Sequence, residues 1–184
     1  VIGLNGDLIC ADTNSGEVIW RKDFEKDFGG KMMSGWGYSE SPLVDGNRLV
    51  CTPGAEDAMI VSLDKHTGEE IWRAAVPDFG SRGKDGAGYS SIVISEGVGV
   101  KQYIQLTGRG VISLRSSDGK FLWGYNEVAN GTANIPTPIV SGEHVFCSTG
   151  YETGAALLRM TKVGNEIDVE EVYFLDAKTF QNSH

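Results

Sequence analysis

Short apolar and β-branched runs alternate with glycine-containing turns along this chain. Runs of this kind, bounded by Gly, Asp, Asn and Ser, predict β-strands joined by tight turns. The strands expected in the central part are 41–44, 48–52, 58–64 and 70–75, followed by 91–95, 100–106, 110–115 and 121–125. Farther along, the partly alternating segment 162–176 predicts a hairpin. Long helical periodicity is missing, so the pattern indicates an all-β protein.

One nine-residue pattern recurs in phase with these strands. It begins at Asp12, Asp64 and Arg115, has a glycine four residues later, and ends on a tryptophan four residues after the glycine. The three tryptophans are 52 and 51 residues apart. A fixed period of this size indicates a repeat architecture. Four-stranded units of this length, repeated radially, are propeller blades.

These positions resemble the PQQ-like repeat family of β-propellers, whose blade motif is approximately Ala-x-Asp-x-x-Thr-Gly-x-x-x-Trp. The resemblance implies that each tryptophan docks between blades and that the aspartate and glycine shape the turn. The third copy departs from the motif at Arg115, so its turn is expected to be held by Asp118. The structural positions are therefore expected to be Asp12, Gly16, Trp20, Asp64, Gly68, Trp72, Gly119 and Trp123.

The expected fold is an arc of about three to four antiparallel four-stranded blades. The corresponding segments are 1–28 (the end of one blade), 36–78, 86–128 and 132–184 (a partial or atypical blade). Related propellers close with about six to eight blades, so the chain is expected to be part of a larger propeller. The alternative is that two copies of the chain complete one ring.

Composition and charge narrow the classes of partner. A net charge of −9 argues against nucleic acid and against anionic membrane surfaces. No apolar run is long enough to span a membrane. Cys10, Cys51 and Cys147 each lie in a strand-like run and are expected to be buried thiols.

Glycine-rich loops precede the first strand of each unit, and they carry the candidate ligand-binding residues. Trp36 and Tyr38 lie in the first such loop, Tyr89 in the second, and Asn130 and Asn134 in the third. Loops at equivalent places in a propeller share one face, so we expect these side chains around one mouth, where they suit a small ligand or a peptide. The competing interpretation is that they only pack the turns between blades.

No catalytic or metal-binding residue is predicted. There is no adjacent Cys-Cys pair, no acidic cluster at ligand spacing and no G-x-S-x-G nucleophile motif. His66, His144 and His184 are scattered and have no ligand partner at a suitable spacing.

The leading hypothesis is a non-catalytic repeat module that presents loops to a protein or a small ligand and needs no cofactor. The resemblance implies a periplasmic or other extracytoplasmic location in bacteria, with the remaining blades of a parent chain or a second copy as further partners. The alternative is a fragment of a PQQ-dependent alcohol or sugar dehydrogenase, with PQQ and Ca²⁺ bound mostly by residues outside this chain. A third possibility is an inert scaffold.

Overall fold

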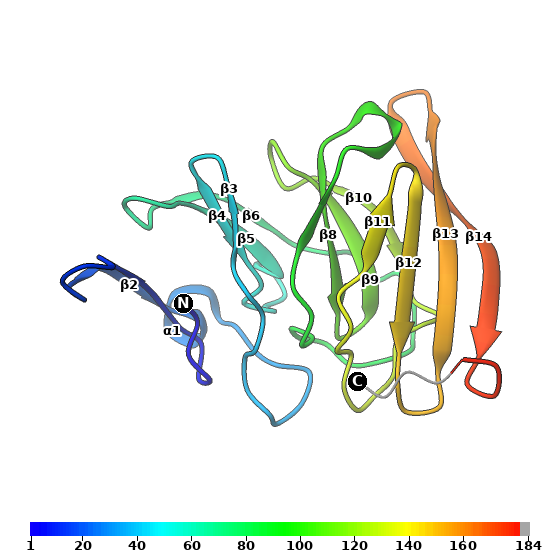
Figure 1. The fold of residues 1–184 in the computed structure, drawn as a ribbon, viewed down its shortest axis with the longest axis horizontal. Coiled ribbons are helices and arrows are strands. Elements are labelled where there is room, and N and C mark those ends of the chain that lie inside the picture. The colour runs from blue at the N-terminus through cyan, green and yellow to red at the C-terminus, as the bar shows by residue number, and fades with distance from the viewer. Residues whose placement is uncertain (181–184) are drawn as a thin grey trace.

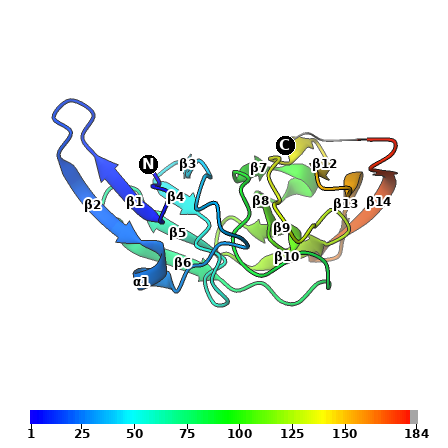
Figure 2. The ribbon, with the colours of Figure 1, turned by 90° about the horizontal axis from the view of Figure 1, so that it is seen from below.

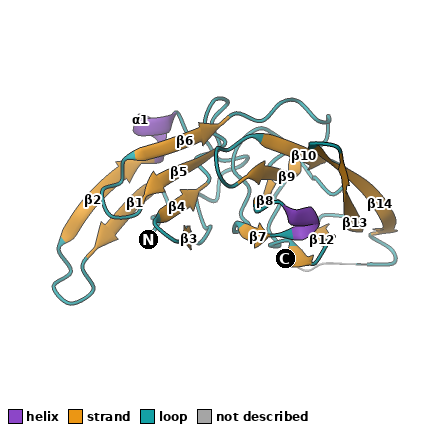
Figure 3. Cartoon of the chain, turned by 90° about the horizontal axis from the view of Figure 1, so that it is seen from above, coloured by secondary structure: helices purple, strands orange, loops and turns teal. Residues whose placement is uncertain are grey.

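The computed structural model describes residues 1–180, which form four antiparallel sheets along an open arc (Figures 1–3). The first sheet is a pair, β1 (Asp7–Ala11) and β2 (Val18–Asp23). The second holds β3 (Leu43–Asp45), β4 (Arg48–Cys51), β5 (Ile60–Asp64) and β6 (Glu70–Ala74). The third holds β7 (Val93–Ser95), β8 (Gln102–Thr107), β9 (Gly110–Arg115) and β10 (Phe121–Tyr125). The fourth holds β11 (Ile139–Ser141), β12 (His144–Thr149), β13 (Gly154–Val163) and β14 (Glu166–Asp176).

Within each sheet the strands follow one another in chain order. The hydrophobic core lies between the sheets, in three clusters that join the first sheet to the second, the second to the third and the third to the fourth. The predicted all-β propeller arc is confirmed. The last residues of the expected fourth unit, 181–184, lie outside the described residues, and His184 is among them.

Two details of secondary structure refine the predictions. The hairpin expected at 162–176 is present but longer, because β13 begins at Gly154 and turns back at Gly164. A five-residue helix, α1 (Phe24–Phe28), was not predicted. It starts where the Asp23 carboxylate accepts the Lys26 amide (3.0 Å) and ends at Gly29, whose φ of 68° is left-handed.

The repeated turn is held by its aspartate. Asp12 Oδ1 accepts the amides of Asn14 (2.9 Å) and Ser15 (2.8 Å). Asp64 Oδ1 accepts two amides in the same way, at 2.8 and 3.0 Å. In the third copy Asp118 takes over, since its Oδ1 accepts both Arg115 Nε (2.8 Å) and the Lys120 amide (3.2 Å). The expected substitution of Asp118 for the missing aspartate is confirmed.

The glycine of the turn makes room for the tryptophan of the preceding sheet. The Trp20 indole donates to the Lys65 carbonyl (3.0 Å), and a Cβ atom at Gly68 would lie 2.8 Å from the Trp20 ring. Trp72 meets the next turn in the same way, with a Cβ at Gly119 only 2.6 Å from its ring. Each of these tryptophans therefore reaches forward and covers a glycine in the following sheet.

The fourth sheet makes this joint differently. The turn of its long β13–β14 hairpin also contains a glycine, Gly164, but a Cβ atom there would meet nothing within 4 Å, so no tryptophan covers it. Trp123 instead shares a core with Met160 and Ile167 of the hairpin. The Trp123 indole donates within its own sheet, to Gln102 Oε1 (3.1 Å). In β14 the residue equivalent to these tryptophans is Tyr173. It is the first paired residue after the bulge in its strand, as Trp72 is in β6.

A buried polar network joins the second and third sheets. Glu40 is only 7% exposed, and its Oε1 accepts the Thr52 amide (2.5 Å). From the third sheet, Gln105 Nε2 donates to Thr52 Oγ1 (3.2 Å) and to the Ser90 carbonyl (2.9 Å), and it lies 3.5 Å from Glu40 Oε2. Burial raises the pKa of the Glu40 carboxyl from 4.5 to about 7, because the ionised form has lost its water.

Candidate binding site on the loop face

The segments that lead into the first strands are hydrogen-bonded side by side. The Ser41 amide donates to Ser91 Oγ (2.9 Å), and the Ser91 amide donates to Thr137 Oγ1 (3.0 Å). These three residues are therefore equivalent positions in successive repeats. The residues two places before them, Ser39, Tyr89 and Ile135, come together for the same reason.

These residues form one wall of a cavity of about 290 Å³, which we call the mouth pocket. Its lining consists of Trp36, Ser39, Tyr89, Ala133, Ile135 and Tyr151. No charged side chain is among them. Tyr151 belongs to the β12–β13 loop, so the pocket lies on the face that carries this loop. The loop itself is at the lower edge of the ribbon in Figure 1.

Two aromatic side chains of the pocket meet at a fixed angle. The rings of Trp36 and Tyr89 lie edge to face, with centroids 6.0 Å apart and planes at 66°. Ser34 Oγ donates to the Thr132 carbonyl (2.7 Å) and lies 2.6 Å from the Tyr89 hydroxyl, which therefore donates to it. This chain of bonds holds the Tyr89 ring in place, while Trp36 remains 60% exposed.

Tyr151 enters the pocket from a strained loop. Tyr151 and Glu152 both have left-handed backbones, with φ of 56° and 60°. Such a conformation costs an L-residue about 1–2 kcal/mol, and strain of this kind concentrates at functional sites. Sequence reasoning missed Tyr151; the signal it offered was an aromatic residue between Gly150 and Gly154, just after the strand-like run that holds Cys147.

Tyr38 does not lie in the mouth pocket, contrary to the sequence prediction. Its ring packs edge to face on Phe24 at 5.0 Å, and its hydroxyl donates to the Pro53 carbonyl (2.9 Å). The reason is the alternation of side chains along an extended segment. Ser39, and not Tyr38, is the residue equivalent to Tyr89, so Tyr38 points toward the first sheet.

Asn130 and Asn134 are also placed differently from the prediction, because both are buried and serve the loop itself. Asn130 Oδ1 accepts the Thr132 and Ala133 amides (both 2.8 Å). Asn134 Nδ2 donates to the carbonyl of Thr107, the last residue of β8 (2.9 Å), and to that of Gly108 in the loop that follows (3.0 Å). With these partners the two amides shape the loop that carries Ala133 and Ile135, and neither lines the cavity.

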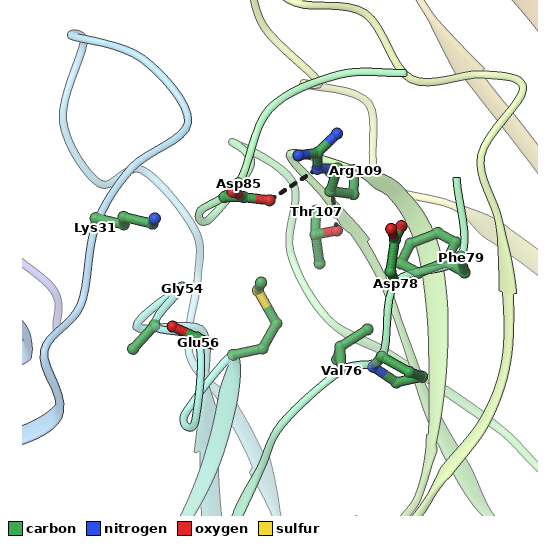
Figure 4. A pocket seen from close by; sticks show the side chains of 12 residues that line it. Lys31, Gly54, Glu56, Val76, Asp78, Phe79, Asp85, Thr107 and Arg109 are labelled. Carbon is green, nitrogen blue, oxygen red and sulfur yellow. Dashed lines mark hydrogen bonds and ion pairs between the residues drawn. The ribbon is translucent and has the colours of Figure 1, made fainter. Parts of the chain in front are cut away.

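A second cavity of about 400 Å³ opens between the loops of the second and third sheets (Figure 4). We call it the interblade pocket. Its wall contains an ion pair between Arg109 Nε and Asp85 Oδ1 (2.8 Å), drawn as a dashed line in Figure 4, and Arg109 lowers the pKa of the Asp85 carboxyl. Its lining comprises Lys31, Gly54, Ala55, Glu56, Met59, Val76, Pro77, Asp78, Phe79, Asp85, Thr107 and Arg109.

Metal-binding and membrane-spanning features were sought within residues 1–180. No group of three or more His, Cys, Asp or Glu side chains in this range could hold a metal ion. No helix in this range is long and apolar enough to cross a membrane. Cys51 and Cys147 are buried, as expected, whereas Cys10 is only partly buried, and all three thiols are free.

Comparison with known proteins gives a family for the chain. Residues 1–171 match a family model described as outer membrane protein assembly factor BamB. A curated protein of that name from Kangiella koreensis is 28% identical over 151 residues, which cover 81% of this chain and 32% of the relative. The chain thus spans about a third of the length of this relative. A quinohemoprotein alcohol dehydrogenase from Pseudomonas putida superposes with a TM-score of 0.48 at 16% identity, over 97% of this chain and 31% of that one.

Proposed function

The chain belongs to the PQQ-like repeat family represented by outer membrane protein assembly factor BamB, and we propose that it is a non-catalytic binding unit. In this proposal the mouth pocket receives an uncharged apolar group of a partner protein, and no cofactor takes part. By its relationship to an outer membrane assembly factor, the unit would act in the bacterial periplasm.

The observation that carries the proposal is the exposed aromatic lining of the mouth pocket. Trp36 and Tyr151 are 60% and 44% exposed, although side chains of this size are usually covered. Tryptophan and tyrosine are the residues most enriched at the energetic centres of protein interfaces. Because Tyr89 is already held by Ser34, its ring needs little ordering when a partner binds.

The four tryptophan indoles give a direct test by NMR with ¹⁵N-labelled protein. The Trp20, Trp72 and Trp123 indoles donate inside the fold, whereas the Trp36 ring is exposed at the pocket. Titration with N-acetyl-phenylalaninamide should therefore shift the Trp36 indole signal in a saturable way and leave the other three unchanged.

Matched variants separate the pocket from the rest of the loop face. Tyr151→Ala should remove the saturable shift, because it deletes one wall of the cavity. Tyr38→Phe should keep it, since Tyr38 lies outside the pocket. A shift that survives Tyr151→Ala, or no saturation in the unchanged protein, would refute the proposal. A saturable shift produced only by PQQ with Ca²⁺ would instead favour the dehydrogenase hypothesis.

A further inference from the structure

The interblade pocket lies on the same face as the mouth pocket. Its residues come from the loops after β4 and β8 and from the segments that follow β2 and β6. The backbone of Lys31, a residue of the interblade pocket, is tied to the segment that leads to Tyr89 of the mouth pocket, because the Ala87 amide donates to the Lys31 carbonyl (2.9 Å). One face thus presents two pockets whose segments are hydrogen-bonded to each other.

One part of the lining of the interblade pocket is apolar. Met59 is almost fully buried, and Val76 and Phe79 are half-buried beside the Pro77 ring. The Phe79 ring packs on Phe121 with centroids 6.2 Å apart, which fixes its position. A surface of this kind suits a chain of methylene groups.

The rim of the pocket carries an excess of negative charge. Three carboxylates, Glu56, Asp78 and Asp85, face two cations, Lys31 and Arg109. Arg109 is engaged by Asp85, so Glu56 and Asp78 remain as exposed carboxylates on opposite sides of the opening in Figure 4. The net charge of −9 on the whole chain adds a field that attracts cations.

We propose that the interblade pocket binds an arginine or lysine side chain of the same partner protein whose apolar group enters the mouth pocket. The inference therefore rests on the proposed function. The methylene stem lies along Met59 and Val76, and the cationic head reaches Glu56 and Asp78. Arginine is the better fit, because its flat guanidinium can both stack on Phe79 and bond a carboxylate.

Methionine methyl groups provide a readout inside this pocket. In protein labelled with ¹³C-methyl methionine, N-acetyl-arginine amide should shift the Met59 signal in a saturable way. Met160 is fully buried in the core of the third and fourth sheets and should not move. N-acetyl-citrulline amide, which has the same shape without the charge, should bind at least about tenfold more weakly, since charged hydrogen bonds are about twice as strong as neutral ones.

Variants that change the charge of the rim test whether negative charge is what binds the arginine probe. The double variant Glu56→Gln with Asp78→Asn should lose about tenfold in affinity for the arginine probe, whereas Lys31→Gln should gain affinity by removing a like charge. Glu17→Gln, in an exposed turn of the first sheet, is the matched control and should change nothing.

Two results would overturn the inference. One is equal binding of the arginine and citrulline probes; the other is an unmoved Met59 signal at saturating probe. Either result with the Trp36 response intact removes this inference alone and leaves the proposed function standing. Loss of the Trp36 response to the apolar probe contradicts the proposed function itself.

Discussion

Replacement of Glu40 by Gln should make the protein more stable at neutral pH. Glu40 lies between the second and third sheets, and its contacts there are polar but neutral: the Thr52 amide, and Gln105 from the third sheet. An ionised carboxylate in such a place has lost its water without gaining a cation, which costs free energy. A glutamine keeps an oxygen for the Thr52 amide and carries no charge.

The magnitude follows from the raised pKa of the Glu40 carboxyl, about 7 in the folded protein against 4.5. One pKa unit corresponds to 1.36 kcal/mol, so ionisation of Glu40 opposes folding by about 3 kcal/mol. The folded state binds the proton more tightly than the unfolded state does. Below about pH 4.5 both states are protonated and the cost is absent; it grows as the pH rises and is complete above about pH 7.

Urea unfolding of the two proteins from about pH 4.5 to about pH 8 measures this difference. Glu40→Gln and the unchanged protein should have similar free energies of unfolding at the acid end. At the basic end the variant should be more stable by about 3 kcal/mol. Glu17→Gln is the control for removing an exposed carboxylate. A difference that does not vary with pH would refute the reasoning, because it would show that the charge of Glu40 is not the cause.

Two further predictions concern the joints between sheets, both measured by thermal or urea unfolding. Gly68→Ala should lower the free energy of unfolding by about 2–4 kcal/mol, because Gly68 has a left-handed backbone and the new Cβ would also clash with the Trp20 ring. Gly46→Ala should lower it by only about 1–2 kcal/mol, because Gly46 has the same backbone but open space around its Cβ position. Equal losses at the two glycines would contradict the contact. Trp72→Ala should cost about 3–5 kcal/mol and Trp36→Ala well under that, because the first ring is buried and the second is exposed; similar losses would place the joint elsewhere.

The repeat and its turn could be predicted because they are local. The aspartate, the glycine and the tryptophan lie within nine residues of one another, and the strands between them alternate clearly. Even the exceptional third turn was predictable, since Asp118 stands close to the missing position. The contact between Gly68 and the Trp20 ring could not be predicted, because Trp20 belongs to the preceding repeat and no local pattern indicates that the two residues meet.

The candidate site was only partly predictable, for two physical reasons. First, the similarity in composition aligns the glycine-rich loops only to within one residue. An error of one residue reverses the side to which a side chain in an extended segment points. For this reason the sequence predicts Tyr38 in the mouth pocket, whereas the residue found there is Ser39. Second, burial depends on neighbours far away in the chain. Asn134 looks like an exposed loop residue in the sequence, yet it is fully buried and its side-chain amide donates to the carbonyl of Thr107 in β8.

The forward contact from tryptophan to glycine has a consequence for how such chains change in length. Every regular repeat carries both residues of the contact: its glycine meets the tryptophan of the unit before it, and its tryptophan meets the glycine of the unit after it. Whole repeats can therefore be gained or lost by duplication or deletion without creating an unmatched surface, so a single repeat does not specify how many there are. The fourth sheet is the exception, because no tryptophan covers the glycine of its hairpin turn, and this sheet therefore has a fixed position in the order of the repeats.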